Sequence, residues 1–361
     1  MKEKTLGEFI SEGSINLKRR IPQSGLFELT YRCNLDCVHC YCKGSERLGK
    51  ELNADEVKGI LDQLHKEGCL GITFSGGEPL IREDFWEIYL YAKRKGFLID
   101  IFTNGTLLTE EKQKFLKEYP PRSIEITLNG ISRETYEAIT RVKGSFNKVM
   151  ANIRGLISRD MPLVIKANCL KQNKEQIAKI KALTKELFGE DKKRFKFDPH
   201  IYPRLNRDKA PSQYRLNPFE LKEVMESDAE IYAEYEERLR AEHSLAKDKE
   251  FLYQCSSWLT KFFINPFGRL KFCQFTGNFS TDLRKNSFKQ GFYNRFPMLM
   301  KERFKNNSKC KDCRLRALCF HCPARANLET GDEESAVPYY CELAKETTKQ
   351  ISKLYVSGST E

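Results

Sequence analysis

Two stretches decide the fold: Thr30–Cys42, which reads TYRCNLDCVHCYC, and Thr73–Leu80, which reads TFSGGEPL. Each overlaps or follows a short run of β-branched, aliphatic and aromatic residues, Leu26–Thr30 and Gly71–Ser75, that is typical of a buried strand. An amphipathic segment, Asn53–Glu67, lies between the two runs. A strand, a helix and a second strand in this order predict a parallel pair with loops at the same edge.

The alternation of strand and helix patterns continues toward the middle of the chain. Further strand candidates lie at Leu98–Thr103, Ile124–Leu128, Leu163–Cys169 and Arg194–Phe197. Six strands, each followed by a helix, predict the α/β class and a partial (β/α)6 TIM-type barrel with right-handed crossovers. A doubly wound open sheet is the alternative.

Two helix starts carry capping signals. Asn53 precedes the clearest helical pattern, with Glu56 three residues later, as in a capping box, and Gly68 follows its end. Thr109 precedes a later helix in the same way.

Composition limits the function classes. The 361 residues, 40% of them hydrophobic, are enough for a sizeable core, so disorder is excluded as the main state. Sixty-two Lys and Arg against 50 Asp and Glu leave a net charge of +12, which is only weak support for nucleic-acid binding, and we do not expect it. Thirteen cysteines, an odd number, argue for metal binding rather than a disulfide framework.

Nothing in the sequence predicts a membrane span or a secretory signal. Uncharged runs such as Phe251–Thr260 are about half as long as a membrane helix needs. The first residues, MKEKTLGEFISEGS, lack a continuous apolar segment. We therefore expect a cytoplasmic protein.

The patterns divide the chain into four parts. Residues 1–21 are an N-terminal extension, and residues 22–200 carry the strand and helix repeats. Residues 201–254 begin as a bridge rich in Pro, Asn and Arg and continue into a charged helix, Glu220–Lys247. Residues 255–361 are dense in cysteine and poor in periodicity, so we expect a small domain built around metal instead of a hydrophobic core.

Cys33, Cys37 and Cys40 follow the first strand within eight residues. Three thiolates on one loop can hold three irons of a 4Fe-4S cube and leave the fourth iron open to a substrate. Cys42 competes for that fourth place, but it would have to bend back sharply. A zinc site completed by His39 is the structural alternative.

The glycine pair Gly76 and Gly77 ends the second strand, and Asn104 follows the third. Glycines let a backbone approach a ligand closely. Because α/β barrels build active sites at the carboxyl ends of their strands, these two loops and the cysteine loop converge on one mouth.

CxxxCxxC after strand one, with GGEP after strand two, resembles the radical S-adenosylmethionine (SAM) superfamily over about residues 22–200. The resemblance implies that the cysteine trio ligates the cluster and that SAM chelates the open iron. It implies that SAM is cleaved to methionine and a 5′-deoxyadenosyl radical, which abstracts a substrate hydrogen. It also places five residues around the methionyl amino group: Ser75, Gly76, Gly77, Glu78 and Pro79.

Other positions match the family less closely. His39 stands where the family usually has an aromatic residue that stacks on adenine, and Asn129 replaces a usual Asp. Thr127 and Asn168 are candidates for the ribose. Arg141 is either a partner of the SAM carboxylate or a surface arginine.

The C-terminal cysteines resemble the SPASM domain of radical SAM enzymes, which usually holds two auxiliary 4Fe-4S clusters. Two residues separate Cys319 from Cys322 where the family usually has three. By the family's crossed ligation, the inner cluster takes Cys255, Cys273 and Cys322, and the outer cluster takes Cys310, Cys313, Cys319 and Cys341. The inner cluster then has only three cysteine ligands. Its fourth iron is either open to substrate or bound by another ligand, such as Asp282 or a carbonyl. Alone, the two CxxC pairs would also suit a zinc ribbon.

The resemblance implies an oxidoreductase of the peptide-maturase type that crosslinks, epimerises or oxidises a ribosomally made peptide. The expected partners are this peptide, a separate small leader-binding protein, and a reductant such as ferredoxin or flavodoxin. The alternative enzyme is a protein dehydrogenase of the anaerobic sulfatase-maturase type. A zinc-binding interaction protein is the alternative from another class.

Overall fold

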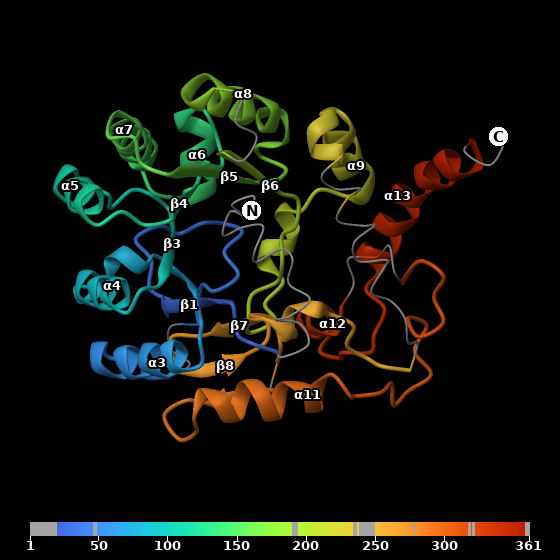
Figure 1. Ribbon diagram of the computed structural model, residues 1–361. Helices are drawn as coiled ribbons and strands as arrows, with labels where there is room; N and C mark the ends of the chain where they lie inside the picture. The colour runs from blue at the N-terminus through green and yellow to red at the C-terminus, as the bar shows by residue number, and fades with distance from the viewer. Residues whose placement is uncertain are drawn as a thin grey trace, which may run out of the picture.

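The computed structural model describes residues 20–45, 49–189, 194–233, 237, 250–277, 279–316, 319 and 322–357, without the side chains of 348–357. Six parallel strands form the first part of the fold (Figure 1). They are β1 (Ser24–Thr30), β2 (Gly71–Gly76), β3 (Leu98–Thr103), β4 (Ser123–Thr127), β5 (Leu163–Asn168) and β6 (Phe195–Asp198). All six strands predicted from the sequence are confirmed, within one or two residues at most ends.

The strand order shows which α/β architecture is present. The nine-stranded sheet runs β6-β5-β4-β3-β2-β1-β7-β8-β9, so β1 to β6 lie in chain order without a reversal. A doubly wound sheet reverses its order at a switch point, so that alternative is excluded. The partial TIM-type barrel is confirmed.

Helices cover the outer side of this curved sheet (Figure 1). They are α3 (Ala54–Lys66), α4 (Phe85–Arg94), α5 (Glu110–Glu118), α6 (Arg133–Thr140), α7 (Ser145–Ser158) and α8 (Ile177–Phe188). At the start of α3, the Asn53 side chain accepts a hydrogen bond from the Glu56 N–H at 2.9 Å, and the Glu56 carboxylate accepts one from the Asn53 N–H at 2.9 Å. The predicted capping box is therefore confirmed. Thr109 precedes α5, but its side chain makes no capping hydrogen bond, so that part of the prediction is wrong.

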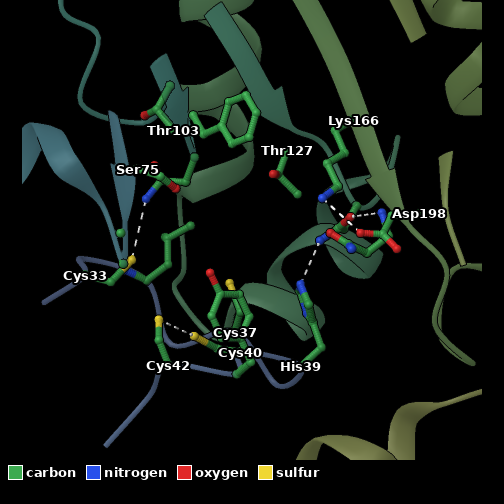
Figure 2. Close-up of a pocket in the computed structure, with 18 of the residues that line it drawn as sticks. Cys33, Cys37, His39, Cys40, Cys42, Ser75, Thr103, Thr127, Lys166 and Asp198 are labelled. Atoms are coloured by element: carbon green, nitrogen blue, oxygen red, sulfur yellow. Dashed lines mark hydrogen bonds and ion pairs between the residues drawn. The ribbon is translucent and has the colours of Figure 1, made fainter. Parts of the chain in front are cut away.

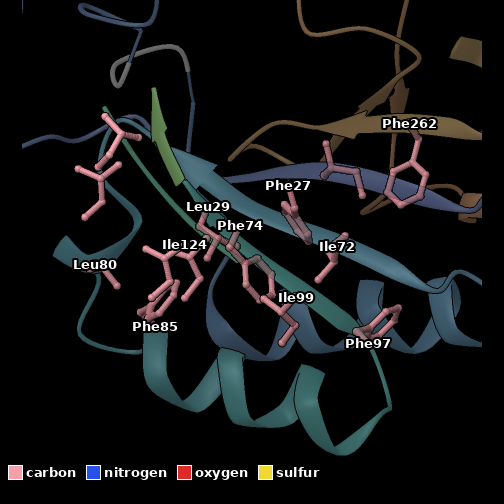
Figure 3. Packing of buried hydrophobic residues seen from close by; sticks show 14 of the residues in the cluster. Phe27, Leu29, Ile72, Phe74, Leu80, Phe85, Phe97, Ile99, Ile124 and Phe262 are labelled. Atoms are coloured by element: carbon pink, nitrogen blue, oxygen red, sulfur yellow. The ribbon is translucent and has the colours of Figure 1, made fainter. Parts of the chain in front are cut away.

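The core lies between the strands and these helices (Figure 3). Phe27, Phe74 and Ile99 project from three neighbouring strands and are at most 1% exposed. Phe85, on α4, packs edge-on against Phe74 with ring centroids 6.1 Å apart. Burial of such side chains fixes the strands, and with them the loops at their carboxyl ends.

The cysteine-rich region joins the same sheet. Strand β7 (Lys261–Ile264) pairs in parallel with β1, and β8 (Arg269–Lys271) and β9 (Thr281–Asp282) continue it antiparallel. Phe262, Phe288 and Phe292 are at most 2% exposed and belong to the main core. The expectation that this region lacks a hydrophobic core is wrong, because its aromatic residues pack on the barrel.

The rest of the chain connects and covers these parts. Residues 199–217 are irregular as predicted, apart from the short 3-10 helix η4 (Ala210–Tyr214). Helix α9 (Pro218–Glu226) covers only the start of the charged helix predicted over Glu220–Lys247, and most of residues 234–249 lie outside the described part. Helices α11 (Phe296–Leu299), α12 (Pro323–Thr330) and α13 (Pro338–Ser357) follow β9. No helix among the described residues has the length and apolar character needed to span a bilayer. The four-part division of the chain stays a prediction.

Candidate active site

A cavity of about 360 Å³ opens at the carboxyl ends of the barrel strands. Its wall includes ten of the residues predicted for cluster and SAM binding: Cys33, Cys37, His39, Cys40, Ser75, Gly76, Gly77, Asn104, Thr127 and Asn168. The sheet therefore brings together residues from five strand ends and their loops, as the sequence predicted.

The cysteine loop is anchored by its backbone. The Asp36 N–H donates to the Thr140 carbonyl at 2.9 Å, and the Val38 N–H donates to the Ile139 carbonyl at 2.9 Å. Both acceptors lie in the last turn of α6, so this helix end holds the loop at the cavity mouth.

Hydrogen bonds also tie the glycine loop to the cysteine loop. The Gly77 N–H donates to the Thr30 carbonyl at 2.8 Å, and the Glu78 N–H donates to the Arg32 carbonyl at 3.0 Å. A Cβ on Gly77 would lie 2.5 Å from the Arg32 carbonyl oxygen, and Gly76 has a φ of +145°. Only glycine fits both positions, which explains the pair physically.

Glu78 acts beneath the cavity surface. It is fully buried, is not among the residues that line the cavity, and accepts hydrogen bonds from the Thr103 hydroxyl at 2.8 Å and the Asn104 N–H at 2.7 Å. Burial raises its pKa to about 7, against the opposing effect of these donors. Its carboxyl group therefore joins the ends of β2 and β3. Pro79 starts the short helix η1 (Pro79–Ile81) and is also buried.

Asn104 connects the third strand to the cysteines. Its amide nitrogen donates to the Asn34 side-chain oxygen at 2.9 Å and to the Cys33 sulfur at 3.7 Å. The three loops thus form one hydrogen-bonded unit around the cavity.

The three thiols lie close enough to influence one another. Burial raises the pKa of Cys33 to about 11, and the neighbouring Cys40 adds to this rise. Burial also raises the pKa of Cys37 well above its usual range, with further increases from Cys40 and Cys33. Bringing thiolates together in a buried site is unfavourable unless a metal offsets their charge.

His39 faces the other side of the cavity, toward the ends of β4 and β5 (Figure 2). Its Nε2 lies 3.3 Å from the Asn129 amide nitrogen, and its buried Nδ1 has no hydrogen-bond partner among the described residues. Burial lowers its pKa to about 4, so the imidazole is neutral. This orientation does not suit the zinc alternative, in which His39 would join the thiols.

Arg141 lies outside the cavity wall. Its side chain is half exposed, donates to the Tyr214 hydroxyl at 3.1 Å, and lies 4.0 Å from the Asp36 carboxylate. The residue ends α6 in the left-handed conformation, with a φ of +57°. This position favours the surface interpretation of Arg141.

The cavity is also lined by two groups of residues that the sequence analysis did not single out. Lys166 and Asp198, at the ends of β5 and β6, form an ion pair at 3.0 Å. Tyr41, Tyr202 and Phe275 form an aromatic wall, in which the Phe275 ring lies 4.5 Å from the Tyr202 ring and 5.8 Å from the Tyr41 ring, between centroids. The ion pair could have been predicted, because both residues lie at the carboxyl ends of barrel strands, where α/β barrels place functional side chains. The aromatic wall could not, because its three residues come from distant segments of the sequence.

The C-terminal cysteines separate into two groups by their mutual influence. Burial raises the pKa of Cys273 to about 11, and Cys322 and Cys255 act on it as neighbours. Burial also raises the pKa of Cys310, with contributions from Cys341 and Cys313.

Cys255 and Cys322 are thus neighbours of Cys273, and Cys313 and Cys341 are neighbours of Cys310, whereas these pairs do not include Cys319. The assignment of inner and outer ligand sets stays a prediction. The Cys319 thiol lies 3.5 Å from the Tyr340 carbonyl oxygen. Asp282, considered as an inner ligand, instead pairs with Arg269 at 3.5 Å and accepts from the Arg284 N–H at 3.0 Å.

Comparison with known sequences decides the family of the barrel. Residues 27–184 match the sequence profile of the radical SAM superfamily. The chain carries a radical SAM domain. The predicted radical SAM domain and the prediction of an enzyme are therefore confirmed, and the family of this domain implies SAM and a 4Fe-4S cluster as cofactors.

The match covers very different shares of the sequences of two relatives. The "AdoMet-dependent heme synthase" of Methanosarcina barkeri is 27% identical over 88% of the chain and 96% of its own length. The "PqqA peptide cyclase" of Bradyrhizobium diazoefficiens is 31% identical, over 44% of the chain and only 42% of its own length. The chain thus spans less than half of the second relative.

Among solved structures, "Native anSMEcpe with bound AdoMet and Cp18Cys peptide" shares the fold of most of the chain. It has a TM-score of 0.67 and 19% identity, and the match covers 93% of this chain and 98% of that one. The cysteine-rich C-terminal part therefore belongs to the shared fold.

The side chains that face the cavity of the radical SAM domain fit a 4Fe-4S cluster. Among the described residues, no group of three or more His, Cys, Asp and Glu side chains is arranged to hold one metal ion. Each cysteine of a cluster binds a different iron, so its sulfurs stand farther apart than around zinc. Three thiols facing one cavity, together with the unpartnered buried His39 Nδ1, suit a cluster and a polar ligand.

Proposed function

We propose that Cys33, Cys37 and Cys40 hold the 4Fe-4S cluster and that the cavity beside them binds SAM. The observation that carries this proposal is the convergence of the three thiols and the glycine loop on one cavity of a radical SAM domain. When bound, the cluster supplies the electron that cleaves SAM and so provides the radical that abstracts hydrogen.

The chain's own residues then have distinct tasks. The backbone of Ser75, Gly76 and Gly77 receives the methionyl group. The two glycines let this loop pack closely against the backbone of Thr30 and Arg32, which holds it beside the thiols. Glu78 and Pro79 hold this loop from behind. Asn104 contributes to the SAM-binding wall beside Cys33. Thr127 and Asn168 face the ribose, and the neutral His39 lies beside the adenine. Mutagenesis tests these assignments.

Two auxiliary 4Fe-4S clusters complete the proposal. Cys255, Cys273 and Cys322 hold the inner cluster, which lacks a fourth cysteine, and Cys310, Cys313, Cys319 and Cys341 hold the outer one. The division of these thiols into two groups supports the assignment. Residues 255–361 would then be the auxiliary-cluster domain, and both clusters would accept or relay the electron left on the substrate.

The substrate we propose is a ribosomally made peptide that is crosslinked, epimerised or oxidised. A peptide cyclase among the relatives and a peptide-bound structural neighbour support this class. The same proposal includes two partners, a separate leader-binding protein and a ferredoxin or flavodoxin as reductant. It also includes the cytoplasm as the compartment. A protein dehydrogenase is the alternative within it.

A tetrapyrrole is the second candidate substrate. The match with the heme synthase covers 96% of that protein's length. The aromatic wall of Tyr41, Tyr202 and Phe275 offers ring faces on which a flat macrocycle would stack.

The two substrates are separated by an anaerobic assay with SAM and dithionite. We expect 5′-deoxyadenosine together with a mass change in a peptide encoded beside this chain. A mass change in an iron porphyrin and none in the peptide would select the second candidate. Absence of SAM cleavage in a protein that contains iron and sulfide would contradict the proposal as a whole.

A further inference from the structure

Cys42 is a buried thiol that the proposed function does not use. Its side chain is 2% exposed, and its sulfur lies 3.5 Å from the Cys40 sulfur (Figure 2). The sequence placed Cys42 as a competitor for the fourth ligand position of the cluster.

The contact itself argues against ligation by Cys42. A separation of 3.5 Å is close to that of two thiolates on one metal ion. In a cubane cluster each cysteine binds its own iron, so two ligand sulfurs stand farther apart. Cys42 is therefore not placed to close the iron that Cys33, Cys37 and Cys40 leave open.

The chemistry of the pair fixes the direction of the hydrogen bond. A cysteine that binds iron is a thiolate and has no proton to donate. In the loaded protein, Cys40 can only accept, and the Cys42 S–H is then the donor.

We propose that Cys42 is a positioning residue whose S–H donates to the Cys40 thiolate and raises the reduction potential of the SAM-binding cluster. Reduction adds negative charge to the cluster and its ligands, and a hydrogen-bond donor stabilises the reduced form more than the oxidised form. The inference rests on the proposed cluster site.

The test compares anaerobic holoprotein with Cys42→Ala, Cys42→Ser and Cys69→Ala variants. Cys69 is a matched control, since it is a buried thiol whose S–H donates to the Gly71 carbonyl, 3.4 Å away, on the barrel side remote from the cavity. The measurement is a redox titration of the electron paramagnetic resonance signal that changes when SAM is added.

We expect Cys42→Ala to make reduction up to about tenfold less favourable, a shift of about 59 mV to more negative potential for one electron. Cys42→Ser keeps a donor, and Cys69→Ala leaves the contact intact, so both retain potentials near that of the unmodified protein.

Two results would overturn the inference. One is an unchanged potential in Cys42→Ala. The other is loss of the SAM-responsive signal in both Cys42 variants but not in Cys69→Ala, which would make Cys42 a ligand or a packing residue. Absence of any SAM-responsive signal in the unmodified protein would instead contradict the proposed function.

Discussion

The cavity cysteines and the C-terminal cysteines differ in how much regular secondary structure and hydrogen bonding surrounds them. The loop with Cys33, Cys37 and Cys40 is hydrogen-bonded to α6 and to the glycine loop, above six paired strands. In the C-terminal part, β8 and β9 have three and two residues, and Cys313 is exposed. The barrel site is therefore formed by the fold, whereas we expect the outer cysteine group to depend on its proposed cluster.

The largest effect expected from this difference follows removal of one barrel ligand. Cys37→Ala abolishes SAM cleavage and leaves the absorption of the auxiliary clusters, because the barrel holds its shape without that thiol. Cys313→Ala is the control, since Cys313 is a proposed ligand of the outer cluster in the C-terminal part of the chain. Retained 5′-deoxyadenosine formation in Cys37→Ala would refute the ligand assignment.

Iron removal produces a large but regional effect. Chelation accelerates amide hydrogen exchange in peptides covering 308–316 by about tenfold or more, since metal binding and local folding are coupled there. Peptides of β2, β3 and β4 change little, because their cores are apolar. Equal acceleration in both regions would show that the barrel also depends on metal.

A smaller effect tests the fit of the glycine loop. Gly77→Ala places a Cβ against the Arg32 and Tyr31 carbonyl oxygens, so we expect a loss of about 1–3 kcal/mol in the free energy of unfolding. SAM affinity falls with it, by about tenfold or more.

Gly59→Ala is the matched control in this test. Gly59 lies inside α3 with no atom within 4 Å of an added Cβ, and alanine favours helix by about 1 kcal/mol. Denaturant unfolding and SAM titration measure both variants. Equal SAM affinity in Gly77→Ala and the unmodified protein would show that the close backbone approach is not needed.

The barrel was predictable because its signals are local. Strand patterns, the capping box of Asn53 and Glu56, and the loop positions after strands all depend on neighbours in the sequence. Thr109 shows the limit, since it stands at the N-cap of α5 but its side chain makes no capping hydrogen bond.

The features that sequence missed depend on distant contacts. Glu28 lies in β1 and is fully buried, and Tyr41, on the cysteine loop, donates to its carboxyl group at 2.6 Å. The distant strand β7 pairs with β1 on its other edge. The aromatic wall of Tyr41, Tyr202 and Phe275 joins three separate segments. The contact of Cys42 with Cys40 depends on the loop conformation, which no periodicity encodes.

Electron paramagnetic resonance of the anaerobically reduced protein, with and without SAM, tests the open iron most directly. We predict a 4Fe-4S signal that changes on SAM addition and disappears in Cys37→Ala. A protein without such a signal, or with a cluster signal that ignores SAM, would contradict the assignment of Cys33, Cys37 and Cys40 as a three-cysteine cluster site.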